Sequence, residues 1–199
     1  MPADSINAFK YQRFVIAYHG CDTLTREKVV LGEEHLVKSE RPHDWLGHGI
    51  YFWEHGYDRA LKWAQKKKQM GQIQTPCVVG ALIQLGNCFD LLDTQYTEVL
   101  ETSWSAFEAR FLSEGLALPE NIPGYPGDTD RVKRLLDCAF LNWVIDRTEL
   151  SESIEFDTVR GLFPEGEPAF PGGSIQKESH IQISVRNPSC ILGYFMPKL

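Results

Sequence analysis

The sequence predicts a mixed α+β fold, because strand-like and helix-like patterns occupy different parts of the chain. Short runs of β-branched and aromatic residues lie near both ends, at 14–18 and 190–195, and such runs are typical of strands. Two long segments between them repeat apolar residues at helical spacing. The length of 199 residues, with 43% apolar and 24% charged side chains, indicates one globular domain over 1–199.

The charge balance narrows the classes of function. Lys and Arg number 20 against 27 Asp and Glu, and this net charge of -7 disfavours a general phosphate-backbone binder or a membrane-surface protein. No basic and apolar leader opens the chain, so we expect a cytoplasmic location. The cysteines are scattered and never form a C-x-x-C pair, which predicts reduced, mostly buried thiols at Cys21, Cys77, Cys88, Cys138 and Cys190.

The first part of the chain predicts two strands and a helix. The apolar run 14–18 leads into His19-Gly20-Cys21, so this strand should deliver a histidine to its C-terminal end. Two glycines, Gly47 and Gly49, predict a tight turn into a second strand that carries Tyr51. From position 57 the apolar residues recur at helical spacing, with lysines in the last turn.

The rest of the chain alternates strands with a helical insert. A strand over 77–85 should end in a turn at Gly86-Asn87. Helical periodicity over 96–112, ended by Gly115, and over 132–144, behind a cap at Asp128-Thr129, predicts a helical insert at about 90–154. Further strands are expected at 156–163, 179–185 and 190–195, and 164–174 should be a loop without regular structure.

Three motifs in this order carry a family resemblance. They are a strand that ends in Tyr-His-Gly, a Gly-x-Gly-Ile-Tyr-Phe segment followed by a helix, and a late strand that runs into Val-Arg-Asn-Pro-Ser-Cys-Ile-Leu. Together they resemble the ADP-ribosyltransferase superfamily, in its poly(ADP-ribose) polymerase and diphtheria-toxin branch. The resemblance covers about 14–64 and 172–195. It implies a split core of two small antiparallel sheets around a cleft for NAD⁺. The helical insertion lies outside the resemblance.

The resemblance assigns roles to individual residues. His19 matches the histidine that bonds the nicotinamide ribose, and Gly20 matches the glycine whose backbone holds the nicotinamide amide. Cys21 stands where the family has Ser or Thr, and a thiol is a poor hydrogen-bonding group. Tyr51 matches the aromatic residue that stacks on nicotinamide, and Trp63 is nearest to the second stacking position. Gly49 belongs to the Gly-x-Gly-Ile-Tyr-Phe motif and is the last residue of the NAD⁺-binding set that the resemblance implies.

The third catalytic position is a choice between two residues. Alignment of 185–191 with the family turn places Gln182 at the catalytic glutamate, whereas Glu178 is the carboxylate on the same strand segment. Both share a strand face with His180. The family carboxylate stabilises the positive charge that develops on the ribose, and glutamine carries no charge and is no base. With Gln182 in place we expect single transfer rather than polymer synthesis.

The resemblance therefore implies a mono-ADP-ribosyltransferase that cleaves NAD⁺, releases nicotinamide and modifies a macromolecule, either protein or nucleic acid. A bacterial toxin or effector with a neutralising antitoxin or inhibitor protein fits a compact member of this kind. The alternatives are an inactive NAD⁺- or ADP-ribose-binding module and an RNA 2′-phosphotransferase, which the acidic composition disfavours.

Two smaller expectations concern the acceptor and metals. The loop at 164–177 is expected either to contact the acceptor through Phe163, Glu167 and Phe170 or to be a solvated crossover. Four histidines lack metal-ligand spacing with a carboxylate or thiolate, so we expect no metal at His35, His43, His48 and His55.

Overall fold

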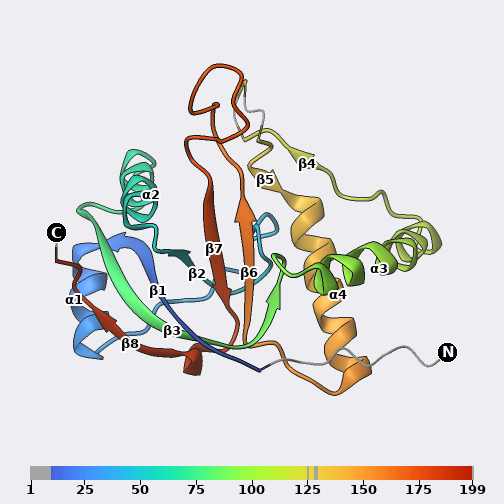
Figure 1. Ribbon diagram of the computed structural model, residues 1–199, viewed down its shortest axis with the longest axis horizontal. Helices are drawn as coiled ribbons and strands as arrows, with labels where there is room; N and C mark the ends of the chain where they lie inside the picture. The colour runs from blue at the N-terminus through green and yellow to red at the C-terminus, as the bar shows by residue number, and fades with distance from the viewer. Residues whose placement is uncertain (1–9, 125, 128–129, 199) are drawn as a thin grey trace.

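The computed structural model describes residues 10–124, 126–127 and 130–198, and a six-stranded sheet in the order β1-β2-β7-β6-β3-β8 organises it (Figure 1). Every neighbouring pair is antiparallel except β3 and β6, which run parallel. The mixed α+β class is therefore confirmed. The strands are β1 (Lys10–Asp22), β2 (Ile50–Glu54), β3 (Pro76–Asp90), β6 (Thr158–Phe163), β7 (His180–Val185) and β8 (Ile191–Phe195).

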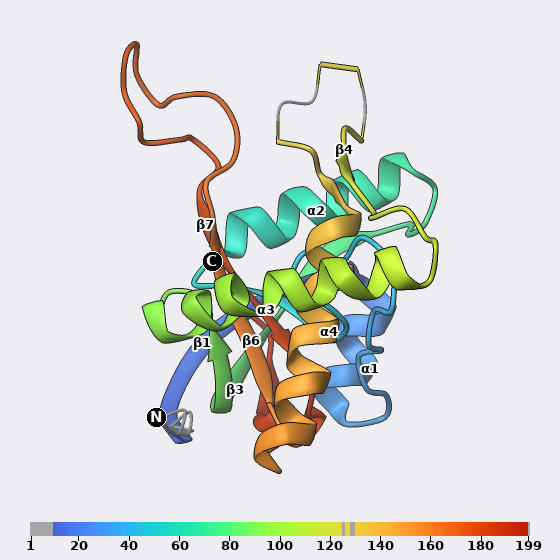
Figure 2. The ribbon, with the colours of Figure 1, turned by 90° about the vertical axis from the view of Figure 1, so that its right-hand side faces the viewer.

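The helices lie on both flanks of the sheet, with α1 and α2 at one end and α3 and α4 packed together at the other (Figures 1 and 2). They are α1 (Thr23–Leu31), α2 (Tyr57–Gln69), α3 (Thr94–Ser113) and α4 (Leu135–Glu152), and the short strands β4 (Asn121–Ile122) and β5 (Lys133–Arg134) pair between α3 and α4. The two helices expected in the insert are present. The second begins later than expected, since Val132 precedes it, and Asp128 and Thr129 lie outside the described residues.

Strand β3 corrects two expectations. The chain does not turn at Gly86-Asn87, because β3 continues to Asp90 through a bend at Gly86, whose φ is +61°. A Cβ at Gly86 would lie 2.3 Å from the Asp157 carboxylate, which accepts the Asn87 N–H at 2.8 Å. Beyond the bend β3 joins β6, and before it β3 pairs with β1. The described strands of the core thus form one continuous sheet rather than the two expected.

The segment between β6 and β7 is also more regular than expected. The Ala169 N–H donates to the Ile175 carbonyl at 2.7 Å, and the Lys177 N–H donates to the Glu167 carbonyl at 3.0 Å. These bonds extend the antiparallel β6–β7 pair into a projecting hairpin, which Figures 1 and 2 show at the top of the molecule. The segment 164–174 contains no helix or strand, as predicted, but these cross-strand bonds, which have no local sequence signature, order it.

The two faces of the sheet differ in what covers them. One face forms a core against α1 and carries the side chains of Ala17, Phe52 and Ile183, none of which is exposed. The same face buries Arg160, which pairs with the carboxylates of Glu54 and Asp90. The other face is covered by α2 near Trp53 and by α4 further along.

The packing of α2 against β1 depends on a glycine. A Cβ at Gly20 would lie 2.2 Å from the Ala60 carbonyl oxygen, so only glycine lets the helix approach the strand this closely. All five cysteines are buried and free, as expected. Within the described residues, none of the helices has both the length and the apolar character needed to cross a membrane.

Candidate functional site

The candidate site is an opening between β1 and β2. These strands are paired only at Ala17–Glu54 and Tyr18–Trp53, and His19 is the first residue beyond the last pair. Beyond the last pair, β1 and β2 diverge. Just before β2 begins, Gly49 bonds instead to the loop residue Ser39, and their backbones exchange hydrogen bonds of 2.8 and 3.0 Å. We call the space between the diverging strands the β1–β2 opening.

His19 bridges the narrow end of this opening. Its Nδ1–H donates to the Tyr51 carbonyl oxygen at 2.7 Å, which fixes the tautomer and leaves Nε2 as an acceptor. Burial, helped by the nearby positive charge of Lys67, lowers the pKa of His19 to about 4, although the backbone bond opposes this. His19 is therefore neutral at pH 7 and can accept a hydrogen bond from a ligand hydroxyl.

The Tyr51 hydroxyl is fully engaged by the turn that precedes its strand. It donates to the Gly47 carbonyl at 2.7 Å and accepts the Leu46 N–H at 2.7 Å. Burial raises the pKa of Tyr51 well above its usual value. The hydroxyl is consequently an anchor, and the part of Tyr51 that is suited to a ligand is its ring.

Gln182 lies on β7, directly opposite Trp53 and diagonal to Tyr51, which pairs with Ser184. Residues opposite or diagonal to one another in an antiparallel pair share a face, and diagonal Cα atoms are about 7–8 Å apart. The Gln182 amide nitrogen donates to Nε2 of His180 at 2.9 Å. The sheet thus brings Gln182 and Tyr51 onto one face.

His180 holds Gln182 from within an aromatic cluster. Its Nδ1–H donates to the Glu178 carbonyl at 2.8 Å, so Nε2 must be the acceptor for Gln182. Its ring centroid lies 6.1 Å from Trp45, 6.4 Å from Trp53 and 5.8 Å from Phe163. Burial lowers the pKa of His180 to about 4, which keeps it neutral at pH 7.

The Glu178 carboxylate is engaged in ion pairs with side chains of α2 rather than with Gln182. Its carboxylate contacts Arg59 at 2.7 Å and Lys62 at 3.3 Å, both on α2, and Arg59 also pairs with Glu165. Partial burial would raise the pKa of Glu178, but these cations outweigh it and lower the pKa. Glu178 is therefore a half-exposed, neutralised carboxylate between α2 and the hairpin, and Gln182 is the candidate beside Tyr51.

The backbone around Gly20 faces α2. The Gly20 carbonyl accepts a hydrogen bond from Nζ of Lys67 at 3.2 Å, and burial lowers the pKa of Lys67. The Cys21 side chain points into the core on the opposite face, where its Sγ lies 3.9 Å from that of Cys77. Burial raises the pKa of Cys21 to about 12, so this thiol is protonated at pH 7.

Trp63 and Gly49 are the remaining residues of the expected NAD⁺-binding set. Trp63 is half-buried on α2, with its ring centroid 6.4 Å from Trp53 and Nζ of Lys67 6.0 Å away. A Cβ at Gly49 would lie 2.2 Å from Oγ of Ser184, so this glycine lets β2 and β7 meet. Trp63 borders the opening, and Gly49 shapes its strand.

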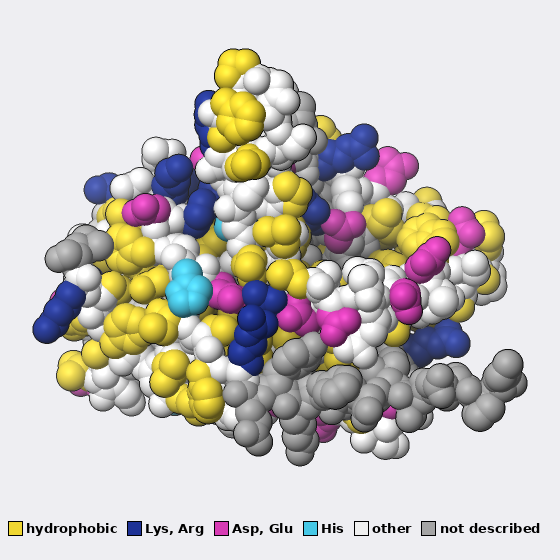
Figure 3. Space-filling view, viewed as in Figure 1, with side chains coloured by type: hydrophobic (Ala, Val, Ile, Leu, Met, Phe, Trp, Pro, Cys, Tyr) yellow, Lys and Arg dark blue, Asp and Glu magenta, His cyan; other side chains and the backbone are white. Residues whose placement is uncertain are grey.

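The residues expected to touch an acceptor separate into two groups. Phe163 is only 6% exposed and packs 4.8 Å from Trp45, so its assignment to an acceptor contact was wrong. Phe170 and Ile175 are 54% and 66% exposed on the hairpin, where Figure 3 shows apolar side chains at the top of the molecule. Glu167 contributes its carbonyl to the hairpin ladder.

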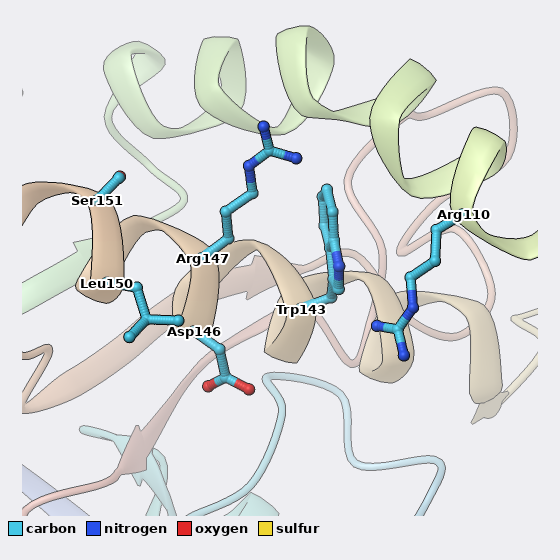
Figure 4. A pocket seen from close by; sticks show the side chains of 6 residues that line it. All are labelled: Arg110, Trp143, Asp146, Arg147, Leu150 and Ser151. Carbon is cyan, nitrogen blue, oxygen red and sulfur yellow. The ribbon is translucent and has the colours of Figure 1, made fainter.

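A shallow hollow lies elsewhere, on the outer side of α4 (Figure 4), with a volume of about 570 Å³. Its lining includes Arg110 from α3 and Trp143 and Arg147 from α4, and contains none of the candidate residues. No group of three or more His, Cys, Asp or Glu side chains that could hold a metal ion occurs within the described residues.

Sequence reasoning gave little weight to the side chains that surround Gln182 in space. None of the three motifs includes Trp45, Trp53 or Arg59. The i, i+2 relation on β7 did indicate that His180 shares a face with Gln182. The partners from 45–63 are separated from β7 by more than a hundred residues, and no pattern in the sequence links them.

Comparison with known proteins adds one distant relative. The chain is 24% identical over 192 residues to "Uncharacterized protein MJ0359" of Methanocaldococcus jannaschii, a match that covers 87% of this chain and 83% of that protein. No family model matches the chain. No solved structure matches it.

Proposed function

We propose that the protein is a mono-ADP-ribosyltransferase, which binds NAD⁺ in the β1–β2 opening. The observation that carries the proposal is His19, held neutral by burial where β1 and β2 part and fixed to the Tyr51 carbonyl at 2.7 Å. Such a histidine offers Nε2 as an acceptor for a ribose hydroxyl. The motif order His-Gly, Gly-Ile-Tyr-Phe and a late Gln-bearing strand supports the same proposal.

The surrounding residues suit a nicotinamide ring. Tyr51, anchored through its hydroxyl, offers a ring that does not need to be ordered on binding, and Trp63 borders the opening from α2. The Gly20 carbonyl accepts a hydrogen bond from Lys67 in the free protein, and its second lone pair can accept one from the amide of nicotinamide. NAD⁺ is a substrate here, and no metal is part of the proposal.

The reaction moves one ADP-ribose group. The glycosidic C–N bond of NAD⁺ breaks and its electron pair leaves with nicotinamide, while a nucleophilic atom of the acceptor bonds to C1′ and its proton passes to solvent. Gln182 can orient a ribose hydroxyl but neither neutralises the developing positive charge nor takes a proton. We therefore propose single transfer rather than polymer synthesis.

The acceptor is proposed to be a macromolecule, a protein or a nucleic acid, that docks near the hairpin between β6 and β7. The exposed Phe170 and Ile175 support an acceptor contact there. A toxin or effector role in the bacterial cytoplasm, with an antitoxin or inhibitor as partner, rests on the resemblance alone.

The test is nicotinamide release from NAD⁺ by the purified protein, with and without cell extract. His19→Ala should lower release at least 100-fold and Gln182→Ala about 10- to 100-fold, because each removes a group that positions the ribose. Glu178→Ala should retain release within about threefold, since its carboxylate is neutralised by cations of α2. Equal release by wild type and His19→Ala would overturn the proposal.

A binding module is the second candidate, and the amide at position 182 specifically favours it. It predicts saturable binding of NAD⁺ or ADP-ribose with no nicotinamide release under any condition. Calorimetric titration with both ligands separates this outcome from transfer.

A further inference from the structure

Lys67 places a positive charge at the candidate site. Its Nζ donates to the Gly20 carbonyl at 3.2 Å, and the side chain is half-buried. The Arg59 and Lys62 side chains of the same helix pair with Glu178. Lys67, in contrast, forms no ion pair within the described residues, so no neighbouring carboxylate among them balances its charge.

The Gly20 carbonyl points into the β1–β2 opening. In an antiparallel sheet, alternate residues of a strand bond to the neighbour on one side, and the residues between them bond to the other side. The Ile16 carbonyl accepts the His55 N–H at 3.0 Å, just past the end of β2, so even-numbered residues of this part of β1 turn their backbone groups towards β2. Gly20 has the same parity, and β2 no longer pairs with β1 at that position. Nζ of Lys67, which bonds to this carbonyl, therefore lies at the opening.

The charge acts where nicotinamide and its ribose are proposed to bind. Burial, followed by the charge of Lys67, lowers the pKa of His19 to about 4, and Nζ of Lys67 lies 6.0 Å from the ring centroid of Trp63. A carbonyl oxygen can accept two hydrogen bonds, and the two donors then lie about 4–5 Å apart. A nicotinamide amide on the Gly20 carbonyl thus has an ammonium group as its neighbour.

We propose that the ammonium group of Lys67 promotes the departure of nicotinamide by repelling the positive charge of the bound ring. This inference rests on the proposed function and adds an electrostatic residue from α2 to it. The nicotinamide ring is cationic in NAD⁺ and neutral once it has left. Lys67 therefore disfavours the bound substrate more than the transition state, which is the condition for faster chemistry.

The charge moves in one step. The glycosidic C–N bond breaks, its electron pair passes to the ring nitrogen, and the positive charge moves from the ring to the ribose. Lys67 gives up no proton in this step. At a separation of about 7 Å, and for an effective dielectric between that of a protein surface and that of water, the repulsion changes an equilibrium about 3- to 50-fold.

The test compares two small ligands, nicotinamide and 1-methylnicotinamide, because the second carries on its ring the positive charge that the ring has in NAD⁺. For each protein the charge selectivity is the dissociation constant of 1-methylnicotinamide divided by that of nicotinamide, both from calorimetric titration. Lys67→Met should lower this ratio about 3- to 50-fold and change the dissociation constant of nicotinamide less than about threefold. In turnover, it should lower kcat by a similar factor without raising KM for NAD⁺.

Two variants control for packing and for general charge. Lys67→Arg keeps the positive charge and should keep the wild-type ratio. Lys68→Met removes the same charge from an exposed position in the same turn of α2, and should also leave the ratio unchanged. If Lys67→Met does not fold, Lys67→Gln gives the same comparison.

The outcomes separate this inference from the proposed function. If nicotinamide binds and the Lys67 variants keep the wild-type ratio, the electrostatic role is refuted and the proposed function stands. Weaker binding of ADP-ribose by Lys67→Met, with an unchanged ratio, would assign the charge to the pyrophosphate and overturn the inference. If the wild type binds both small ligands without turnover, the ratio still decides. If neither nicotinamide nor NAD⁺ binds, both proposals fail.

Discussion

Gly20→Ala tests whether the approach of α2 to β1 shapes the site. An alanine Cβ would lie 2.2 Å from the Ala60 carbonyl oxygen and 3.1 Å from the Ala64 nitrogen, both backbone atoms. A carbon–oxygen contact needs roughly 3.2 Å, so α2 has to move by about 1 Å, and overpacking of this kind costs about 1–3 kcal/mol. Because α2 carries Trp63 and Lys67, a shift of about 1 Å can lower the rate about 100-fold.

The assay combines thermal unfolding with nicotinamide release. We expect the Tm of Gly20→Ala to fall by about 2–12 °C and kcat/KM for NAD⁺ to fall by one to two orders of magnitude. Gly193→Ala in β8 is the matched control, since a Cβ there meets no atom within 4 Å, and it should behave as wild type. A Gly20→Ala protein with wild-type Tm and turnover would refute the packing argument.

Three further predictions concern charge. Arg160→Leu leaves the carboxylates of Glu54 and Asp90 unpaired in the core and should lower the free energy of unfolding by about 3–5 kcal/mol, measured in urea, whereas Arg110→Leu on the surface should cost less than about 1 kcal/mol. The buried, neutral His19 and His180 should each make the protein about 2 kcal/mol less stable at pH 5 than at pH 7: their pKa of about 4 lies below the usual 6.5, so the unfolded chain binds the extra protons in this window. His180→Gln should remove about half of this pH dependence in urea titrations. Gln182→Glu should raise nicotinamide release, by less than about 100-fold.

Much of the fold could be predicted because its signals are local. The helical repeats of α2, α3 and α4 and the apolar run of β1 each follow from neighbouring residues. The continuation of β3 past Gly86 could not be predicted, because Gly-Asn is a turn signal. Here the Asp157 carboxylate, from a distant segment, binds the bent backbone and lets the strand continue.

The candidate site was predictable only in part, for the same reason. His19, Tyr51 and Gln182 stand in motifs and were found in the sequence, and the structure places them on the neighbouring strands β1, β2 and β7. The surroundings of Gln182 depend on cross-strand register. Trp53 becomes its neighbour only because β2 and β7 pair at Phe52–Ile183, and a one-residue slip would turn Gln182 away from it.

The limited gain expected from Gln182→Glu follows from its neighbours. A carboxylate at 182 would face Nε2 of His180, which now accepts the amide hydrogen at 2.9 Å, and it would favour protonation of that nitrogen. The positive charge of the imidazolium would weaken the stabilisation that a carboxylate at position 182 gives to the positive charge developing on the ribose. Replacing His180 with glutamine in the same protein should therefore increase release further, and no additional gain in the double variant would contradict this coupling.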